Sequence, residues 1–159
     1  MDGMDRQAGK SVVGTINNRA GTARIGGCDL TWKAGQYGLF SITHKSVKNG
    51  TRPFSVSSAP AENAVRITTR IGEQPSEFKK ALLELTPGMK ITMRGPVGPF
   101  YLQDENPALF IAGGIGITPF RSILKQIDST PKEVGKPIHL LYMDGNREYL
   151  RGLCFGSRI

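Results

Sequence analysis

Up to residue 102 the chain is dominated by short stretches in which apolar and polar residues alternate. In the clearest one, Val65, Ile67 and Thr69 would face one side of a strand and the residues between them the other. Turn signals such as Lys48-Asn49-Gly50 separate the stretches. Strands are predicted at residues 11–16, 38–43, 54–57, 65–71 and 89–93, with one or two more within 22–32. About six strands at this spacing predict a small antiparallel β-barrel.

One helix interrupts the predicted strands. Phe78, Leu82 and Leu85 recur at the i, i+4 and i+7 positions that share one face of a helix. Ser76 is a typical N-cap residue, and Pro87-Gly88 ends the pattern. We therefore expect a single amphipathic helix within this strand-rich region.

The pattern changes after residue 106. Residues 107–112 form a continuous apolar run, and Gly113-Gly114-Ile115-Gly116 is a glycine-rich turn. A helix is predicted to begin near Pro119, and a second apolar strand follows at residues 138–142. A strand, a glycine turn, a helix and a strand make up the βαβ unit of a parallel sheet.

The helix predicted after Pro119 has a regular apolar stripe. Its apolar residues recur at i, i+3, i+4 and i+7, namely Phe120, Ile123, Leu124 and Ile127. We expect this stripe to be buried, and Arg121 and Lys125 to occupy the solvent-exposed face of the helix.

These elements predict two domains. We assign residues 8–102 to a six-stranded antiparallel Greek-key β-barrel with one helix. Residues 107–159 are assigned to an α/β nucleotide-binding domain. A doubly wound nucleotide-binding domain has ~100–150 residues. We therefore expect the second domain to be incomplete, as in a C-terminally truncated chain.

The composition is that of a globular protein. Hydrophobic residues make up 38% of the 159 positions and charged residues 21%, so a packed core is feasible. A net charge of +8 attracts phosphate-bearing cofactors, acidic carrier proteins, nucleic acid or anionic lipid, and does not choose among them. Cys28 and Cys154 have no second Cys or His at metal-ligand spacing, so neither a metal site nor a disulfide framework is expected. No apolar run is long enough to span a membrane, and the polar N-terminus predicts a cytoplasmic protein.

Candidate chemistry lies at Arg52-Pro53-Phe54-Ser55. A flavin needs a cation for its pyrophosphate, an aromatic face beside its ring system and a hydroxyl near its reactive N5 atom. Alternation along a strand would place Arg52 and Phe54 on one face and Ser55 on the other. Taken alone, these residue types indicate only an arginine and an aromatic residue in a strand.

Four motifs in order resemble those of the ferredoxin–NADP reductase family. Residues 52–58 resemble its Arg-x-Tyr/Phe-Ser-x-x-Ser signature, and residues 34–37 its Pro-Gly-Gln-Phe/Tyr turn, with Ala34 in place of proline. Residues 95–100 resemble its Gly-Pro-x-Gly-x-Phe turn, and residues 113–122 the opening of its nucleotide-binding domain. Together the motifs cover most of residues 30–125.

The resemblance implies an FAD-dependent oxidoreductase that transfers a hydride from NAD(P)H to flavin and passes electrons to an acceptor. Arg52 would bind the FAD pyrophosphate, Phe54 would pack on the flavin, and Ser55 would act as the catalytic residue near N5. The resemblance implies further cofactor-binding residues at Pro53, Ile67, Thr68, Thr69, Ser76, Gly114, Gly116 and Thr118. The acceptor would be an acidic electron-carrier protein or an iron–sulfur domain.

The sequence departs from the family pattern at two places. Pro75 has no N–H, and Glu77 puts a negative charge in the first helical turn, so phosphate binding by this helix is weakened. For Ser76, an N-cap role and a ligand contact both stay open. The glycine turn lacks the third glycine of the dinucleotide fingerprint, and Pro119 stands near its position.

Several functional alternatives stay open. Asp144 would favour NAD and Arg147 would favour NADP, so the choice of nucleotide is undecided. The chain is alternatively a flavin-binding electron-transfer module, or a truncated fragment without full NAD(P)H activity. A basic barrel that binds nucleic acid is disfavoured, because the sequence lacks clustered aromatic residues interleaved with Lys and Arg.

Overall fold

The computed structural model describes the chain in several segments. Side chains are described for residues 30–86, 88–103, 106–130 and 137–143, and the backbone alone for residues 10–17 and 22–26. Predictions for Cys28, Pro87, Asp144, Arg147 and Cys154 therefore lie outside the residues whose side chains are described.

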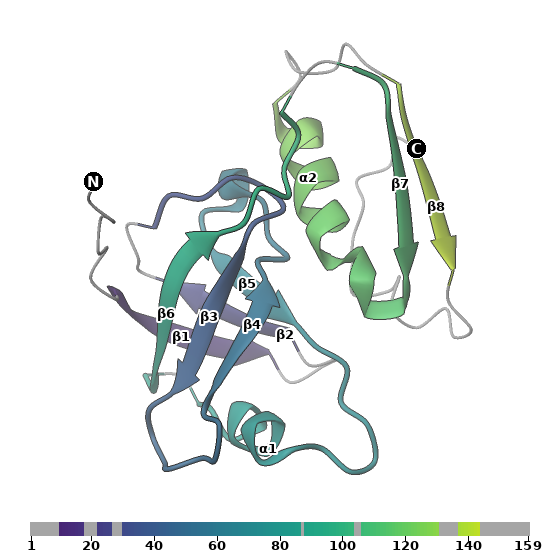
Figure 1. Cartoon of the computed structure of the whole chain (residues 1–159). Coiled ribbons are helices and arrows are strands. Elements are labelled where there is room, and N and C mark those ends of the chain that lie inside the picture. The colour runs from purple at the N-terminus through teal and green to yellow at the C-terminus, as the bar shows by residue number, and fades with distance from the viewer. Residues whose placement is uncertain are drawn as a thin grey trace, which may run out of the picture.

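Six strands form one antiparallel sheet (Figure 1). They are β1 (Lys10–Asn17), β2 (Thr22–Gly26), β3 (Tyr37–Ile42), β4 (Thr51–Ser55), β5 (Val65–Thr68) and β6 (Lys90–Val97). Their order in the sheet is β4-β3-β6-β1-β2-β5. The two outermost strands, β4 and β5, are linked by an isolated antiparallel bridge between Val56 and Ile67. The antiparallel strands predicted from the sequence are confirmed, whereas closure into a Greek-key barrel stays a prediction.

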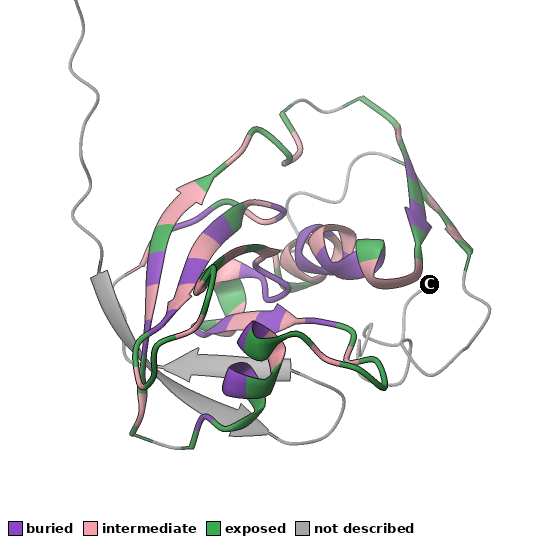
Figure 2. Cartoon of the chain, turned by 60° about the horizontal axis from the view of Figure 1, so that its bottom comes forward, coloured by how far each residue is buried: buried purple, intermediate pink, exposed green. Residues whose placement is uncertain are grey.

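The predicted faces of β5 are confirmed by burial. Val65 and Ile67 are fully buried and Thr69 is nearly so, while Arg66 and Thr68 between them are only partly buried. The buried face belongs to a core that includes Phe40, Ile91 and Met93 from β3 and β6. Figure 2 shows such buried segments along the strands of the sheet and along the helices.

Helix α1 (Glu77–Leu83) covers one end of this core. Ser76 is its N-cap, and the Ser76 hydroxyl accepts a hydrogen bond from the backbone N–H of Lys79 at 3.4 Å. Phe78 and Leu82 are buried, as the sequence predicts. Leu85 is also buried but lies beyond the last helical residue, so the helix is shorter than its apolar pattern.

A second, two-stranded parallel sheet follows. Strands β7 (Ala108–Gly113) and β8 (Ile138–Met143) are connected through a short 3₁₀ helix (Gly114–Ile117) and α2 (Thr118–Ser129). The βαβ unit predicted from the glycine turn is therefore confirmed. Figure 1 shows α2 between the β7–β8 pair and the six-stranded sheet.

Helix α2 is buried on two sides, which corrects the sequence analysis. Its apolar side packs on the parallel sheet, where Phe120 contacts the cluster formed around Ala112 and Ile117. Arg121 was expected to face solvent, but it is only 5% exposed. Because the buried guanidinium has an acidic partner and a carbonyl acceptor, a charged residue is tolerated there. Lys125, also expected on the solvent face, is partly buried and pairs with Asp128 on the same helix.

Within the described segments, no helix is long and apolar enough to cross a membrane. The same segments contain no group of three or more His, Cys, Asp or Glu residues that could hold a metal ion.

Candidate functional site

Arg52 and Phe54 share one face of β4, as predicted, and both contact Phe78 of α1. The guanidinium carbon of Arg52 lies 5.8 Å from the centroid of the Phe78 ring. The Phe54 ring lies 5.8 Å from the Phe78 ring and 6.0 Å from that of Phe40. Phe78 therefore connects helix α1 to the arginine and the aromatic residue of the motif. Sequence reasoning assigned Phe78 only to the core.

Arg52 is partly buried and retains hydrogen-bonding capacity. Its Nη1 atom donates to the carbonyl oxygens of Asn49 at 2.6 Å and Thr51 at 3.0 Å. Neither Nη2 nor Nε has a hydrogen-bond partner among the described residues. These bonds fix the guanidinium near the start of β4 and leave donors for an anion.

Pro53 and Ser55 complete the motif in β4. Pro53 is exposed, and its missing N–H is tolerated because β4 is an outer strand of the sheet. The Ser55 side chain is partly buried, and its hydroxyl has no hydrogen-bond partner in the described segments. A serine hydroxyl in this state is able to donate to, or accept from, a bound molecule.

The predicted residues in β5 and directly after it lie in different surroundings. Ile67 is fully buried in the core, so only its backbone is able to reach a ligand. The Thr68 hydroxyl is 3.0 Å from the Ser57 hydroxyl, and Ser57 follows the Arg52–Ser55 motif by two residues. Thr69 is 8% exposed. The structure therefore joins Thr68 to the motif on β4 and places the Ile67 side chain in the core.

The glycine turn has open space beside its backbone. A Cβ atom added at Gly114 or Gly116 would have no heavy atom within 4 Å, and Gly114 has a φ of +49°. Thr118, the first residue of α2, is 6% exposed and donates from Oγ1 to the carbonyl oxygen of Ile115 at 3.2 Å. The backbone of the turn is thus open to close approach by a ligand, while Thr118 holds the turn together.

The two turn motifs at residues 34–37 and 95–100 interlock. Gln36 donates from Nε2 to the carbonyl oxygen of Gly98 at 3.1 Å. A Cβ atom at Gly35 would overlap the carbonyl oxygen of Phe100, and one at Gly98 would lie 2.8 Å from the Tyr37 ring. Glycine is needed at both positions because the two turns pack backbone against backbone and ring.

An aromatic contact joins these turns to α2. The Phe100 ring lies 5.3 Å from the Phe120 ring, with an edge-on interplanar angle of 74°. Phe120 in turn lies 4.7 Å from Phe110 of β7. A continuous row of three rings therefore runs from the second turn motif, across the helix, to the parallel sheet.

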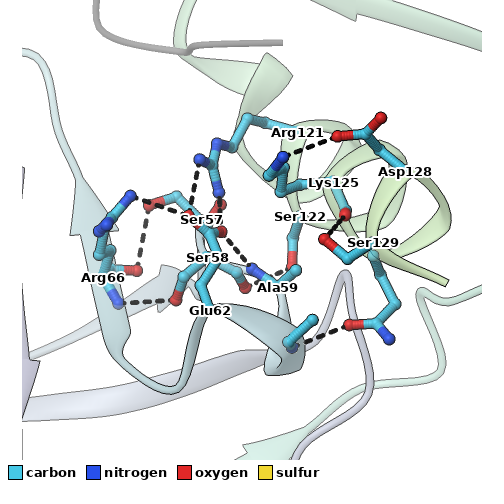
Figure 3. A network of polar contacts seen from close by, with 12 residues as sticks. Ser57, Ser58, Ala59, Glu62, Arg66, Arg121, Ser122, Lys125, Asp128 and Ser129 are labelled. Carbon is cyan, nitrogen blue, oxygen red and sulfur yellow. Dashed lines mark hydrogen bonds and ion pairs between the residues drawn. The ribbon is translucent and has the colours of Figure 1, made fainter. Parts of the chain in front are cut away.

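A polar network joins the end of the β4 motif to the start of α2 (Figure 3). Arg121 donates from Nη1 to the carbonyl oxygen of Ser57 at 3.0 Å, and Ser122 donates to that of Ser58 at 2.6 Å. Arg121 also forms a two-pronged ion pair with Glu62. Figure 3 shows both side chains of α2 pointing toward the connection between β4 and β5.

Glu62 is the acidic centre of this network. Burial disfavours its charge, but hydrogen bonds from Arg121 and the Ala59 backbone, together with the charges of Arg121 and Arg66, outweigh burial. The pKa of Glu62 therefore lies below its ordinary value. Sequence reasoning missed Glu62, and the only available signal was an acidic residue close to the serine motif.

No protein-family model matches the chain. Over 95 residues, it is 35% identical to the toluate 1,2-dioxygenase electron transfer component of Pseudomonas putida. This alignment covers 58% of the chain and 27% of that relative, so the chain spans about a quarter of the relative's length.

Solved structures share the fold over most of the chain. Ferredoxin–NADP⁺ reductase from Plasmodium falciparum superimposes with a TM-score of 0.71 at 19% identity, covering 91% of this chain and 63% of that one. The flavohem-like FAD/NAD binding domain of nitric oxide dioxygenase from Vibrio cholerae gives a TM-score of 0.65 at 20% identity, covering 91% and 69%. The resemblance predicted from the four motifs is thereby confirmed.

Proposed function

The chain is related in sequence and fold to ferredoxin–NADP reductase-like electron-transfer proteins, and from this relationship we propose that it binds FAD and takes part in NAD(P)H-dependent electron transfer. One structural observation supports this proposal most directly. Arg121 and Ser122, at the start of α2, donate to the carbonyl oxygens of Ser57 and Ser58, which end the residue 52–58 motif just beyond β4. The flavin motif and the nucleotide motif are therefore in direct contact.

We propose that the six-stranded sheet closes into a Greek-key barrel. The bridge between Val56 and Ile67 supports closure, because it links the two outermost strands. We further propose residues 8–102 as the FAD-binding domain and residues 107–159 as part of an NAD(P)-binding domain. A cytoplasmic location stays a prediction.

The residues on β4 fit a flavin. Arg52 has donors left for a pyrophosphate, and the Ser55 hydroxyl is unpaired among the described residues. Pro53 lies between them on the outer strand and is exposed. Phe54 is half-buried between Phe40 and Phe78, so its exposed part is the surface that would pack on the cofactor.

The remaining residues take secondary roles in this proposal. Bound FAD would supply the electron-accepting chemistry at N5. The Ser55 hydroxyl would orient that edge by a hydrogen bond, and Arg52 would hold the pyrophosphate. The segment Ile67-Thr68-Thr69 would contribute backbone groups and the Thr68 hydroxyl. Because the Ser76 hydroxyl already accepts the Lys79 N–H, Ser76 would act mainly as a helix cap.

The glycine turn fits the nicotinamide nucleotide. Open space beside Gly114 and Gly116 allows a dinucleotide to approach the backbone, and Thr118 begins the helix that follows. The electron acceptor would be an acidic electron-carrier protein or an iron–sulfur domain, and the net charge of +8 supports an acidic partner.

Flavin content and flavin reduction test the proposal. Protein purified without added cofactor, or mixed with FAD, is expected to show flavin absorbance that stays with the protein on gel filtration. Anaerobic mixing with NADH or NADPH in a stopped-flow instrument is expected to bleach this absorbance with at least one nucleotide. Ser55→Ala is expected to retain FAD but to bleach more slowly, because the hydroxyl near N5 is lost.

Two outcomes would contradict parts of the proposal. A chain that never retains flavin does not have the proposed cofactor site. A chain that retains flavin but is bleached by neither nucleotide is a flavin-binding electron-transfer module, the alternative left open by the sequence. Chemical reduction with dithionite provides the control that the bound flavin is able to accept electrons.

A further inference from the structure

Helix α2 makes polar contacts to one short segment that follows β4. Arg121 binds the carbonyl oxygen of Ser57 and the carboxylate of Glu62, and Ser122 binds the carbonyl oxygen of Ser58. One turn further along the helix, Gln126 accepts the backbone N–H of Ala61 at 3.1 Å. These contacts form what we name the α2 latch, which consists of Arg121, Ser122 and Gln126 with residues 57–62.

The latch is buried at its centre. The side chain of Arg121 is 6% exposed and that of Glu62 is 13% exposed. Arg66 pairs with the same carboxylate at 2.9 Å, and the Ala59 N–H donates to it at 2.8 Å. A carboxylate with this many donors is held in one orientation, and so is the arginine that it pairs with.

The position of the latch in the sequence links it to the proposed chemistry. Ser57 is two residues beyond Ser55, and Arg121 is three residues beyond Thr118. The Arg121–Ser57 hydrogen bond of the latch therefore lies within three residues in the sequence of both Ser55 and Thr118. No other described ion pair joins α2 to the six-stranded sheet part of the chain, since Lys125 pairs with Asp128 within α2.

We propose that Arg121 and Glu62 are positioning residues that set the placement of the Gly114–Thr118 turn relative to Ser55, and thereby the rate at which NAD(P)H reduces the flavin. This inference rests on the proposed function. Neither side chain touches the reacting atoms. They act through the backbone of Ser57 and through the first turn of α2, where a displacement of about 1 Å can cost roughly 100-fold in rate.

Three variants separate positioning from folding. Arg121→Met keeps the length of the side chain but removes every donor, and Glu62→Gln keeps its shape but removes the charge. Arg121→Lys keeps the charge without the two-pronged geometry. It replaces Arg121→Met in the experiment if the methionine variant does not fold. Lys125→Met is the matched control, because it removes a cation from the same helix whose ion pair stays within α2.

The readouts are flavin retention, the stopped-flow rate of flavin reduction at saturating nucleotide, and hydrogen exchange of the α2 and residue 57–62 amides. We expect Arg121→Met and Glu62→Gln to hold FAD within about twofold of the unaltered chain and to slow reduction at least tenfold. Exchange is expected to rise together in both segments. Lys125→Met is expected to change none of the three, and Arg121→Lys to give intermediate values.

Distinct results overturn distinct claims. Unchanged reduction rates in Arg121→Met and Glu62→Gln would overturn the positioning role while leaving the proposed function intact. If these two variants lose bound flavin and reduction rate to the same extent, and Arg121→Lys does so too, the two residues have a purely structural role. This result would also overturn the positioning role. Absence of flavin from the unaltered chain would overturn the proposed function, and hydrogen exchange would still decide whether the latch joins the two segments.

Discussion

The side chain of Gln36 donates from Nε2 to the carbonyl oxygen of Gly98 at 3.1 Å and joins two turns that are 62 residues apart in the sequence. The same side chain accepts the Lys33 N–H through Oε1 at 2.9 Å, so both ends of the amide are used. Both turns belong to motifs that the sequence suggested separately. In the folded chain this hydrogen bond holds the two turns against each other.

Replacement of Gly35 by alanine tests how tightly these turns pack. Gly35 has a φ of +101°, and a Cβ atom there would overlap the carbonyl oxygen of Phe100 and lie 3.0 Å from Ile123. We expect Gly35→Ala to lower the free energy of unfolding by about 2–4 kcal/mol, from left-handed strain plus displacement of neighbouring backbone. Urea unfolding followed by the fluorescence of Trp32, the one tryptophan in the sequence, measures the change.

Two other glycines are controls for this measurement. Gly88 has a φ of +94° with no heavy atom near an added Cβ, so Gly88→Ala isolates the strain of about 1–2 kcal/mol. Gly72 has neither an unusual φ nor a close neighbour, so Gly72→Ala is expected to stay within about 0.5 kcal/mol of the unaltered chain. Equal losses of unfolding free energy in Gly35→Ala and Gly88→Ala would mean that the Phe100 backbone moves away from the added Cβ atom without a measurable energetic cost.

The relative importance of Arg52 and Ser76 for FAD binding is a second prediction. The Arg52 guanidinium is charged and has unused donors, whereas the neutral Ser76 hydroxyl already accepts the Lys79 N–H as a helix cap and has a single O–H to donate. We expect Arg52→Ala to weaken FAD binding by at least tenfold, the order of one lost charge-assisted contact, and Ser76→Ala by less than threefold. Titration of protein with FAD, followed by quenching of flavin fluorescence, gives both dissociation constants.

Arg94→Ala is the charge-matched control for Arg52→Ala, because Arg94 is an exposed arginine on β6 of the same sheet. It is expected to leave FAD binding unchanged. Similar losses in Arg52→Ala and Ser76→Ala would show that the helix N-terminus and the arginine share the pyrophosphate equally, against the ranking proposed for them.

Local patterns in the sequence predicted most of the elements but not all of their ends, since β4 spans Thr51–Ser55 where a strand at residues 54–57 was predicted. The period of two in residues 65–71 predicted the buried face of β5, and the glycine turn before Pro119 predicted the βαβ unit. These features depend on neighbours within a few positions, so a single sequence contains the signal. The end of α1 at Leu83 was not predicted, because Leu85 stays buried outside the helix and continues the apolar pattern.

The long-range polar contacts were not predictable in the same way. Hydrophobic periodicity assigns a charged residue to solvent, yet Arg121 is buried against Glu62, 59 residues earlier in the sequence. The burial is favourable only because Arg121 meets both Glu62 and the backbone carbonyl of Ser57 in three dimensions. Phe78 is a similar case, since its apolar position predicted a core role but not its contact with Arg52.

The outer face of the parallel sheet yields a third prediction. Four apolar side chains on this face are 55–65% exposed, namely Leu109, Ile111, Leu141 and Met143. Parallel sheets in α/β proteins are usually covered on both faces. We expect the isolated chain to bind the dye 1-anilinonaphthalene-8-sulfonate, and the double variant Ile111→Lys/Leu141→Lys, which alters two register partners, to lose at least half of that fluorescence.

Leu83→Lys is the control for this dye measurement, because Leu83 is a single exposed apolar residue on α1. It is expected to leave dye fluorescence nearly unchanged. Equal dye binding by the double variant and the unaltered chain would show that the dye binds elsewhere on the protein.

The ion pair of Glu62 makes the stability of the chain depend on pH. The pKa of Glu62 in the folded chain lies below its ordinary value, so the unfolded chain binds more protons at acidic pH. Its stabilising contribution is therefore fully present above about pH 5 and is lost as the pH falls through the folded pKa. We expect Glu62→Gln to lower the free energy of unfolding by about 1–3 kcal/mol at pH 7 and by much less at pH 3. Urea unfolding at several pH values measures this difference.

Glu84→Gln is the control for this measurement. The pKa of Glu84 is also lowered, chiefly by its hydrogen bond from Lys45, but this pair is exposed and its loss should change stability little at any pH. A Glu62→Gln difference that stays the same from pH 7 to pH 3 would contradict an ionised Glu62 as the source of the stabilisation.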